Sequence, residues 1–214
     1  MTQSPRVYVV DDDLHVLTAF RRLLEAAGYD VITSDSPRDF LDRHDHARPG
    51  CVLLDVGMTE LNGLETQRRM LELGVSRPII FVTGFDDART SVEAMKSGAY
   101  DYLVKPISEN VLLTTVEAAI VSDVKAFHER EDIAKLSKQW RSLTLREREV
   151  MLQVIRGRLN KQIAGDLNIV EKTVKVHRAR VMEKMGVRSV AGLVHIAEKL
   201  GRSGCPEFLP ADHR

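Results

Sequence analysis

The chain has 214 residues, of which 43% are hydrophobic and 29% charged, and its 31 Lys and Arg residues balance its 31 Asp and Glu residues. This length suits two small domains or one large one, and no run approaches the roughly 18 apolar residues that span a bilayer. Composition therefore excludes a membrane-spanning protein, and two cysteines are too few for a disulfide framework.

The first residues lead directly into an apolar segment, without the charged region, long apolar stretch and small-residue cleavage site of an export signal. We interpret Cys51 and Cys205 as reduced thiols. We therefore expect a cytoplasmic protein with no membrane partner.

The net charge of zero conceals two halves of opposite sign. Residues 1–120 contain 12 Lys and Arg and 19 Asp and Glu, a net charge of −7, whereas residues 142–214 contain 14 and 8, a net charge of +6. Such asymmetry indicates a basic half that binds a polyanion, attached to an acidic half.

The first 120 residues alternate short apolar runs with amphipathic stretches of helical period, the pattern of a parallel α/β sheet. We predict a five-stranded, doubly wound, flavodoxin-like domain over residues 1–120. Its predicted strands are residues 7–10, 29–33, 51–54, 79–82 and 100–104. Apolar residues at helical spacing predict helix faces that contact the core: Leu14, Leu17, Phe20, Leu23 and Leu24, then Leu64, Met70 and Leu71, then Val92, Ala94, Met95 and Ala99.

A long helix is predicted to connect the halves. The pattern becomes helical from about Glu109, and neither Gly nor Pro occurs from Ala118 to Trp140. We predict a linker over residues 121–141. Its apolar stripe favours a short coiled-coil contact or a solvated linker about equally; the stripe comprises Ile120, Val124, Phe127, Ile133, Leu136 and Trp140.

Charged and hydroxyl side chains follow the predicted strands at their carboxyl ends, where ligands bind in open parallel sheets. Carboxylates crowded there repel one another unless a hard cation lies among them, and Mg²⁺ prefers oxygen ligands. We predict a Mg²⁺ site with a nucleophilic carboxylate that attacks phosphorus. Asp11 and Asp12 follow the first strand, Asp55 the third, Thr83 the fourth and Lys105 the fifth, with Asp55 as the nucleophile. Asp13 is predicted to be a helix N-cap.

These motifs resemble the receiver domains of two-component response regulators over about residues 6–120. The resemblance implies that Asp55 is the phosphoacceptor and that Thr83 and Lys105 contact the phosphoryl group. It also implies that Mg²⁺ is held by Asp11, Asp12, Asp55 and the main-chain carbonyl of Gly57. Tyr102 would be the switch aromatic, and Gly57 and Phe85 would tune the phosphoryl lifetime.

One loop departs from this family pattern. The chain has Met58-Thr59 where the family usually has Met-Pro, so the loop loses a fixed φ, and Gly57 adds further freedom. We expect weaker preorganisation of the loop but no lost catalytic group.

The basic half is predicted to be a small all-α domain of four helices over residues 142–201, followed by a tail over residues 202–214. Thr144 and Glu147 form a predicted capping box at the first helix. Residues 160–167 make a short helix, residues 168–170 a tight turn, and a basic helix begins near Glu171. This is the pattern of a helix-turn-helix whose second helix enters the major groove.

Helical period separates two faces of that second helix. Val170, Val174, His177 and Val181 are predicted to face the domain core. Lys172, Lys175, Val176 and Ala179 are predicted to face the groove, with Lys175 as a donor to guanine and Val176 against a thymine methyl. Lys161, Thr173, Arg180 and Lys184 better suit phosphates.

Residues 143–199 resemble the LuxR-type DNA-binding domain, notably at 146–150, 160–164 and 173–177. A receiver with this output domain resembles the NarL/FixJ class of transcription regulators, and most closely its FixJ-type members. The resemblance implies a sensor histidine kinase as phosphodonor, a homodimer when phosphorylated, and double-stranded promoter DNA as ligand. RNA polymerase is a further partner that this architecture allows, and residues 189–200 would form a last helix that contributes to dimerisation.

We expect that the chain is not an enzyme and that it catalyses only its own phosphorylation and dephosphorylation. Two alternatives remain. Asp11-Asp12-Asp13 also fits the Asp-x-Asp signature of haloacid-dehalogenase-type phosphatases, with Asp11 as nucleophile. The four helices could instead form a protein interaction module.

Overall fold

The computed structural model describes residues 4–45, 48–59, 61–84, 87–205 and 208; Phe85 lies outside this part. The chain divides into two compact units, Met1–His128 and Glu129–Arg214, called here the N-terminal and C-terminal units. Among the described residues, no helix has both the length and the apolar character needed to cross a membrane.

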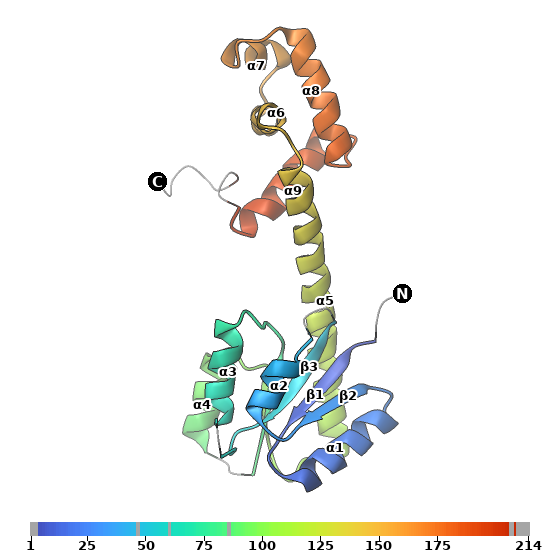
Figure 1. Cartoon of the computed structure of the whole chain (residues 1–214), viewed down its shortest axis with the longest axis vertical. Coiled ribbons are helices and arrows are strands. Elements are labelled where there is room, and N and C mark those ends of the chain that lie inside the picture. Colours follow the sequence, from blue (N-terminus) through green and yellow to red (C-terminus); the bar gives the residue numbers. More distant parts are fainter. Residues whose placement is uncertain (1–3, 46–47, 60, 85–86, 206–207, 209–214) are drawn as a thin grey trace. The chain divides into compact units, whose positions relative to one another are not determined.

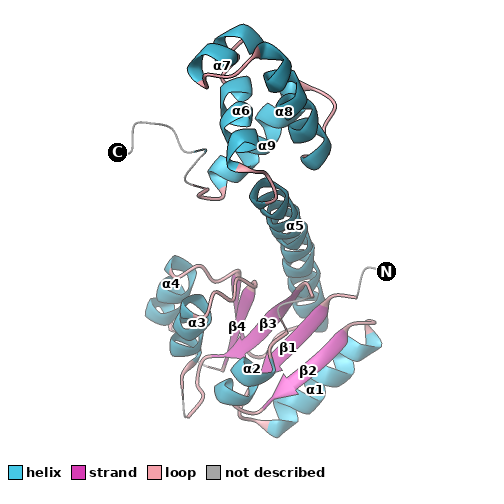
Figure 2. Ribbon diagram, turned by 45° about the horizontal axis from the view of Figure 1, so that its top comes forward, coloured by secondary structure: helices cyan, strands magenta, loops and turns pink. Residues whose placement is uncertain are grey.

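The N-terminal unit contains a five-stranded parallel sheet with the order β2-β1-β3-β4-β5 (Figures 1 and 2). Each predicted strand differs from the observed one by at most one residue at either end. The strands are β1 (Arg6–Val10), β2 (Asp30–Ser34), β3 (Gly50–Asp55), β4 (Ile79–Thr83) and β5 (Asp101–Val104). This order confirms the flavodoxin-like prediction.

Helices cover both faces of the sheet because alternate strand residues point to opposite sides. On one face, Val7 and Val9 pack with α1 (Leu14–Ala26) and the first part of α5. On the other face, Tyr8 and Val10 pack with the remaining helices. These are α2 (Pro37–Arg43), α3 (Gly63–Glu72) and α4 (Ala88–Lys96). Asp13 caps α1 by accepting from the backbone N–H of His15, as predicted.

The prediction of which helix residues contact the core was wrong in part. Val92 and Met95 of α4 are 51% and 47% exposed, and Leu14 and Leu71 are also exposed. α4 has only nine residues, and among them only Ala94 is buried. The helical period identified the apolar face of α4 but not how much of that face the sheet covers.

A single helix, α5 (Glu109–Arg141), begins in the N-terminal unit and ends in the C-terminal unit, which confirms the connecting helix. The predicted linker of residues 121–141 is helical throughout and is shared between the units. Ile120 belongs to the core of the N-terminal unit, whereas Trp140 is buried in the core of the C-terminal unit. The two ends of the predicted apolar stripe therefore pack inside separate units.

Four further helices follow α5, as predicted: α6 (Leu145–Ile155), α7 (Asn160–Asp166), α8 (Glu171–Lys184) and α9 (Val190–Arg202). Thr144 and Glu147 form the predicted capping box. Val174 and Val181 of α8 are buried and His177 is half-buried, but Val170 is 67% exposed. Val170 was wrongly assigned to the core because it is the N-cap of α8, with an extended backbone that lies outside the helical period.

Candidate functional sites

Two acidic residues meet at the carboxyl edge of the sheet. Asp11 follows β1 and Asp55 ends β3, and these strands are parallel neighbours with Val10 beside Leu54. Both carboxylates are buried, with Asp11 3% and Asp55 8% exposed. The boundary between β1 and β3 is the topological switch point of this strand order, where ligands bind in such sheets.

Lys105, which follows β5, joins these two carboxylates. Its Nζ lies 2.7 Å from Oδ2 of Asp11 and 3.0 Å from Oδ1 of Asp55. Burial lowers the pKa of Lys105, but its hydrogen bonds to the two carboxylates outweigh burial, so the pKa lies above its ordinary value. The ammonium group therefore stays charged and neutralises part of the buried negative charge.

One ammonium cannot balance two carboxylates, so negative charge remains at the site. Burial raises the pKa of Asp11, and the charge of Asp55 adds to this effect, while Lys105 and the backbone N–H of Asp13 oppose it. Asp12 is exposed at the rim. The site is therefore rich in oxygen donors and carries excess negative charge, which suits a hard cation such as Mg²⁺.

Only some of the expected ligands of such a cation face one point. Within the described ranges, no three Asp, Glu, His or Cys side chains are grouped so that they could hold one metal ion. Asp11 and Asp55 face the same point, because both bond to Lys105. The Gly57 backbone N–H donates to Oδ2 of Asp55 at 2.6 Å. The expected roles of the Asp12 side chain and the Gly57 carbonyl as metal ligands stay predictions.

The loop after Asp55 is anchored on both sides of Gly57. Gly57 donates to the Asp55 carboxylate, and the next side chain, Met58, is buried in the core. α3 packs closely behind, because a Cβ at Gly63 would lie 2.5 Å from the carbonyl oxygen of Asp55. These contacts restrain the loop next to Thr59, the residue that replaces the usual proline of the family pattern. The expected weaker preorganisation of the loop stays a prediction.

The other predicted residues of this site lie on the adjoining strands. Thr83 ends β4, which pairs with β3, and its side chain is buried. Tyr102 of β5 packs against Phe81, with ring centroids 6.3 Å apart, and its hydroxyl oxygen is buried. The fold therefore brings Thr83 to the same edge as Asp55 and holds Tyr102 inward.

The predicted DNA-contact residues of α8 are on its exposed side. Thr173 is half-buried, and the other members are exposed: Lys172, Lys175, Val176, Ala179 and Arg180. Lys161 of α7 is also exposed. Val174 and Val181 are buried on the opposite side, so α8 presents a basic face with Val176 in it.

Lys184 has an ion-pair partner inside the C-terminal unit. Its Nζ lies 2.6 Å from Oε2 of Glu147, which is buried at the start of α6. Burial raises the pKa of Glu147, but hydrogen bonds from Lys184 and Thr144 outweigh burial and hold the pKa below its ordinary value. The Lys184 ammonium thus ties the end of α8 to α6, and its expected role as a phosphate contact stays a prediction.

A second pairing positions α8 from its other side. Arg178 donates from Nη1 to Oδ1 of Asn160 at 2.7 Å, which joins α8 to the first residue of α7. Arg178 is one of several basic residues in the sequence of α8, and their composition alone does not indicate a partner for it. The helical period does contain the signal, because Arg178 lies beside the buried Val174 and Val181.

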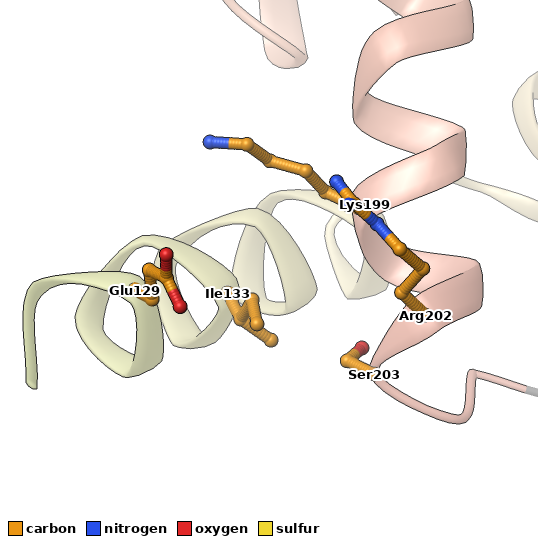
Figure 3. Close-up of a pocket in the computed structure, with 5 residues that line it drawn as sticks. All are labelled: Glu129, Ile133, Lys199, Arg202 and Ser203. Carbon is orange, nitrogen blue, oxygen red and sulfur yellow. The ribbon is translucent and has the colours of Figure 1, made fainter. Parts of the chain in front are cut away.

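A cavity of 290 Å³ lies in the C-terminal unit between α5 and α9 (Figure 3). α5 contributes Glu129 and Ile133, and the α9 side contributes Lys199, Arg202 and Ser203. Nζ of Lys199 also lies 3.5 Å from Oδ2 of Asp132 of α5. This cavity contains none of the predicted phosphoacceptor or DNA-contact residues.

Known proteins resemble both units. The family model of the response regulator receiver domain matches residues 7–117, and that of the luxR family of bacterial regulatory proteins matches residues 141–197. The response regulator protein TodT of Pseudomonas putida is 40% identical over 194 residues, which cover 91% of this chain and 86% of TodT. The transcriptional regulatory protein FixJ of Bradyrhizobium diazoefficiens is 37% identical, covering 94% of this chain and 98% of FixJ. The solved structure of the response regulator StyR is 42% identical, with a TM-score of 0.85 over 92% of this chain and 100% of StyR.

Replacing Asp11 by Asn is expected to stabilise the N-terminal unit at pH 7 by about 1 kcal/mol. The folded-state pKa of Asp11 lies above 3.8, so its protonated form favours folding, and this stability is lost as pH rises through the folded pKa. Urea unfolding from pH 7 towards pH 4 should therefore show the gain shrinking as pH falls. The exposed Asp12→Asn should change stability little, and a less stable Asp11→Asn at pH 7 would mean that the ion pair with Lys105 outweighs burial.

Replacing Glu147 by Gln should lower the free energy of unfolding of the C-terminal unit by about 1–3 kcal/mol, because a charge-assisted hydrogen bond is lost. The folded pKa lies below the ordinary 4.5, so this contribution is fully present above pH 4.5 and is lost as pH falls through the folded pKa. Fluorescence of Trp140, the single tryptophan, reports unfolding of this unit. The exposed Glu149→Gln is the matched control, and equal stabilities of the two variants would contradict the structural role of Glu147.

Proposed function

We propose that phosphorylation of Asp55 controls binding of the C-terminal unit to promoter DNA. The chain belongs to the response regulators with a LuxR-type DNA-binding domain. The chain is a transcription regulator of a two-component system. The observation that carries the proposal is the buried pair of Asp11 and Asp55, which share the Lys105 ammonium at the switch point of the sheet.

In the proposed reaction, a carboxylate oxygen of Asp55 attacks the phosphorus of a phosphohistidine in a sensor histidine kinase. The new O–P bond forms as the P–N bond breaks, and the histidine side chain leaves. Mg²⁺ held by Asp11, Asp12, Asp55 and the Gly57 carbonyl would offset the charge of the phosphoryl group. Lys105 keeps an ammonium beside the acceptor, and the buried Thr83 hydroxyl can donate to a phosphoryl oxygen. We propose that the chain catalyses only this transfer and the later hydrolysis of its own aspartyl phosphate, in which water attacks the phosphorus, the Asp55 carboxylate leaves and inorganic phosphate is released.

Phosphorylation replaces the single negative charge of the Asp55 carboxylate by a phosphoryl group that carries about 1.5–2 negative charges. We propose that this charge draws Thr83 and Lys105 towards the phosphoryl group and changes the position of Tyr102. Apolar side chains near this switch are exposed on α4, on β5, on α5 and just before β5: Val92, Met95, Val104, Val111 and Tyr100. An exposed apolar surface of this kind supports dimerisation of the phosphorylated form.

We propose that α8 enters the major groove, with Lys175 reading guanine, Val176 contacting a thymine methyl and Ala179 allowing close approach. Phosphate contacts are assigned to Lys161, Lys172, Thr173 and Arg180. A dimer would place two copies of α8 on paired half-sites and raise the effective concentration of the second copy. A kinase donor and promoter DNA both imply a cytoplasmic location, and RNA polymerase is a further proposed partner.

Incubation with acetyl phosphate and Mg²⁺ should add the mass of one phosphoryl group to the wild-type chain and none to Asp55→Asn. Intact mass spectrometry measures the transfer, and sedimentation in the same buffer should show a dimer only for the modified protein. Hydrolysis of a small phosphate ester that is lost in Asp11→Asn but kept in Asp55→Asn would instead support the phosphatase alternative.

The Lys175→Ala variant should weaken binding to a selected promoter duplex by about 1–3 kcal/mol and relax its preference for guanine at one position. Lys172→Ala should weaken binding to all sequences and reduce the slope of affinity against salt. Lys184→Ala should mainly lower the stability of the C-terminal unit. Binding titrations over a salt series and urea unfolding distinguish the three, and unchanged base preference in Lys175→Ala would refute the assigned reader.

A further inference from the structure

A buried carboxylate joins α5 to the sheet, at the end of β3 opposite Asp55. Asp123 of α5 is 2% exposed, although its neighbours Val121 and Ser122 are exposed. Its Oδ2 accepts from the backbone N–H of Gly50, the first residue of β3, at 2.8 Å. The two residues are 73 positions apart in the sequence, so this bond is purely tertiary.

A buried carboxylate is strongly unfavourable without charged or hydrogen-bonded partners. A positively charged neighbour of Asp123 is Arg77, which precedes β4 and is itself buried. Burial lowers the pKa of Arg77, while the charges of nearby groups, including Asp123, oppose this effect. Arg77 also donates to the carbonyl oxygens of Asp45 and Arg48 and lies over the Tyr8 ring, 5.1 Å from its centroid.

The start of β3 is shaped to receive these groups. A Cβ at Gly50 would overlap the carbonyl oxygen of Arg6 and would lie 2.9 Å from Nη1 of Arg77. Only glycine therefore fits between β1 and the guanidinium group. The backbone N–H of Gly50 is left for the Asp123 carboxylate, so backbone, cation and anion meet at one point.

This polar contact differs in kind from the apolar packing of α5. The α5 residues buried in the sheet core are apolar: Leu112, Val116, Ala119 and Ile120. Apolar packing is non-directional and tolerates small rotations or shifts of a helix, whereas a hydrogen bond to one backbone N–H does not. Asp123 therefore fixes the rotation and axial position of α5 on the sheet.

We propose that Asp123 is a positioning residue that couples the phosphoacceptor strand to the helix leading into the DNA-binding unit. β3 begins at the contact with Asp123 and ends at Asp55, and α5 continues without a break to Arg141. The proposal rests on the proposed function. A shift of β3 at Asp55 is passed through the Gly50 N–H to α5.

The test compares the affinity for DNA before and after phosphorylation, using a duplex selected from random sequence by the phosphorylated wild-type chain. The dissociation constant of the unphosphorylated chain divided by that of the phosphorylated chain measures the coupling between phosphorylation and DNA binding. We expect the Asp123→Ala variant to lower this ratio at least about tenfold while intact mass shows the same phosphorylation as wild type. Asp123→Asn keeps an acceptor for the Gly50 N–H but removes the charge, so it should lower the ratio less than Asp123→Ala does. The matched control is Glu117→Ala, an exposed acidic residue of the same helix, and it should leave the ratio unchanged.

An unchanged ratio in Asp123→Ala would overturn the inference, even if that variant were less stable. A wild-type chain that gains no phosphoryl group, or whose affinity does not respond to it, would overturn the proposed function and the inference together. A second measurement uses the unaltered chain, so it does not depend on a variant that folds. Phosphorylation should change the hydrogen exchange rates of the Gly50 amide and of the amides of residues 121–128. Unchanged rates at both places would also overturn the inference.

Discussion

Two buried carboxylates and one half-buried ammonium at the end of a parallel sheet are the interaction on which the rest of this structure depends. Asp11 and Asp55 are brought together because β1 and β3 are neighbours, and Lys105 reaches both from the end of β5. The pair would be strongly unfavourable without a cation. The same imbalance of charge makes the edge of the sheet a place for a metal ion and for a phosphoryl group to act.

Buried charges also hold the elements that must respond to this site. Glu147 and Lys184 join α6 to the end of α8, and Arg178 joins α8 to Asn160 of α7. Asp123 joins α5 to the start of β3. In each case apolar packing supplies the core, and directional polar bonds restrain how a helix lies on that core.

The basic residues of the C-terminal unit divide into two classes by their partners. Lys172 and Arg180 are exposed, and Nζ of Lys175 lies 3.4 Å from Oε1 of Glu171 on the same helix. Lys184 and Arg178 bond to groups on other helices. Positive charge near a recognition helix therefore serves both DNA binding and the internal geometry of the domain, and composition does not separate the two uses.

The sequence by itself determined the elements whose signals are local. The five strands, the capping box of Thr144 and Glu147, the N-cap at Asp13 and the acidic strand ends follow from period, turn chemistry and spacing over a few residues. Only the tertiary structure decided which apolar faces are covered and which charges are paired. Val92 and Met95 remain exposed because α4 is short, Val170 lies outside the helix it precedes, and Lys184 and Asp123 bond to partners 37 and 73 residues away. Such contacts depend on where folded elements meet, and a one-dimensional pattern carries no information about that meeting.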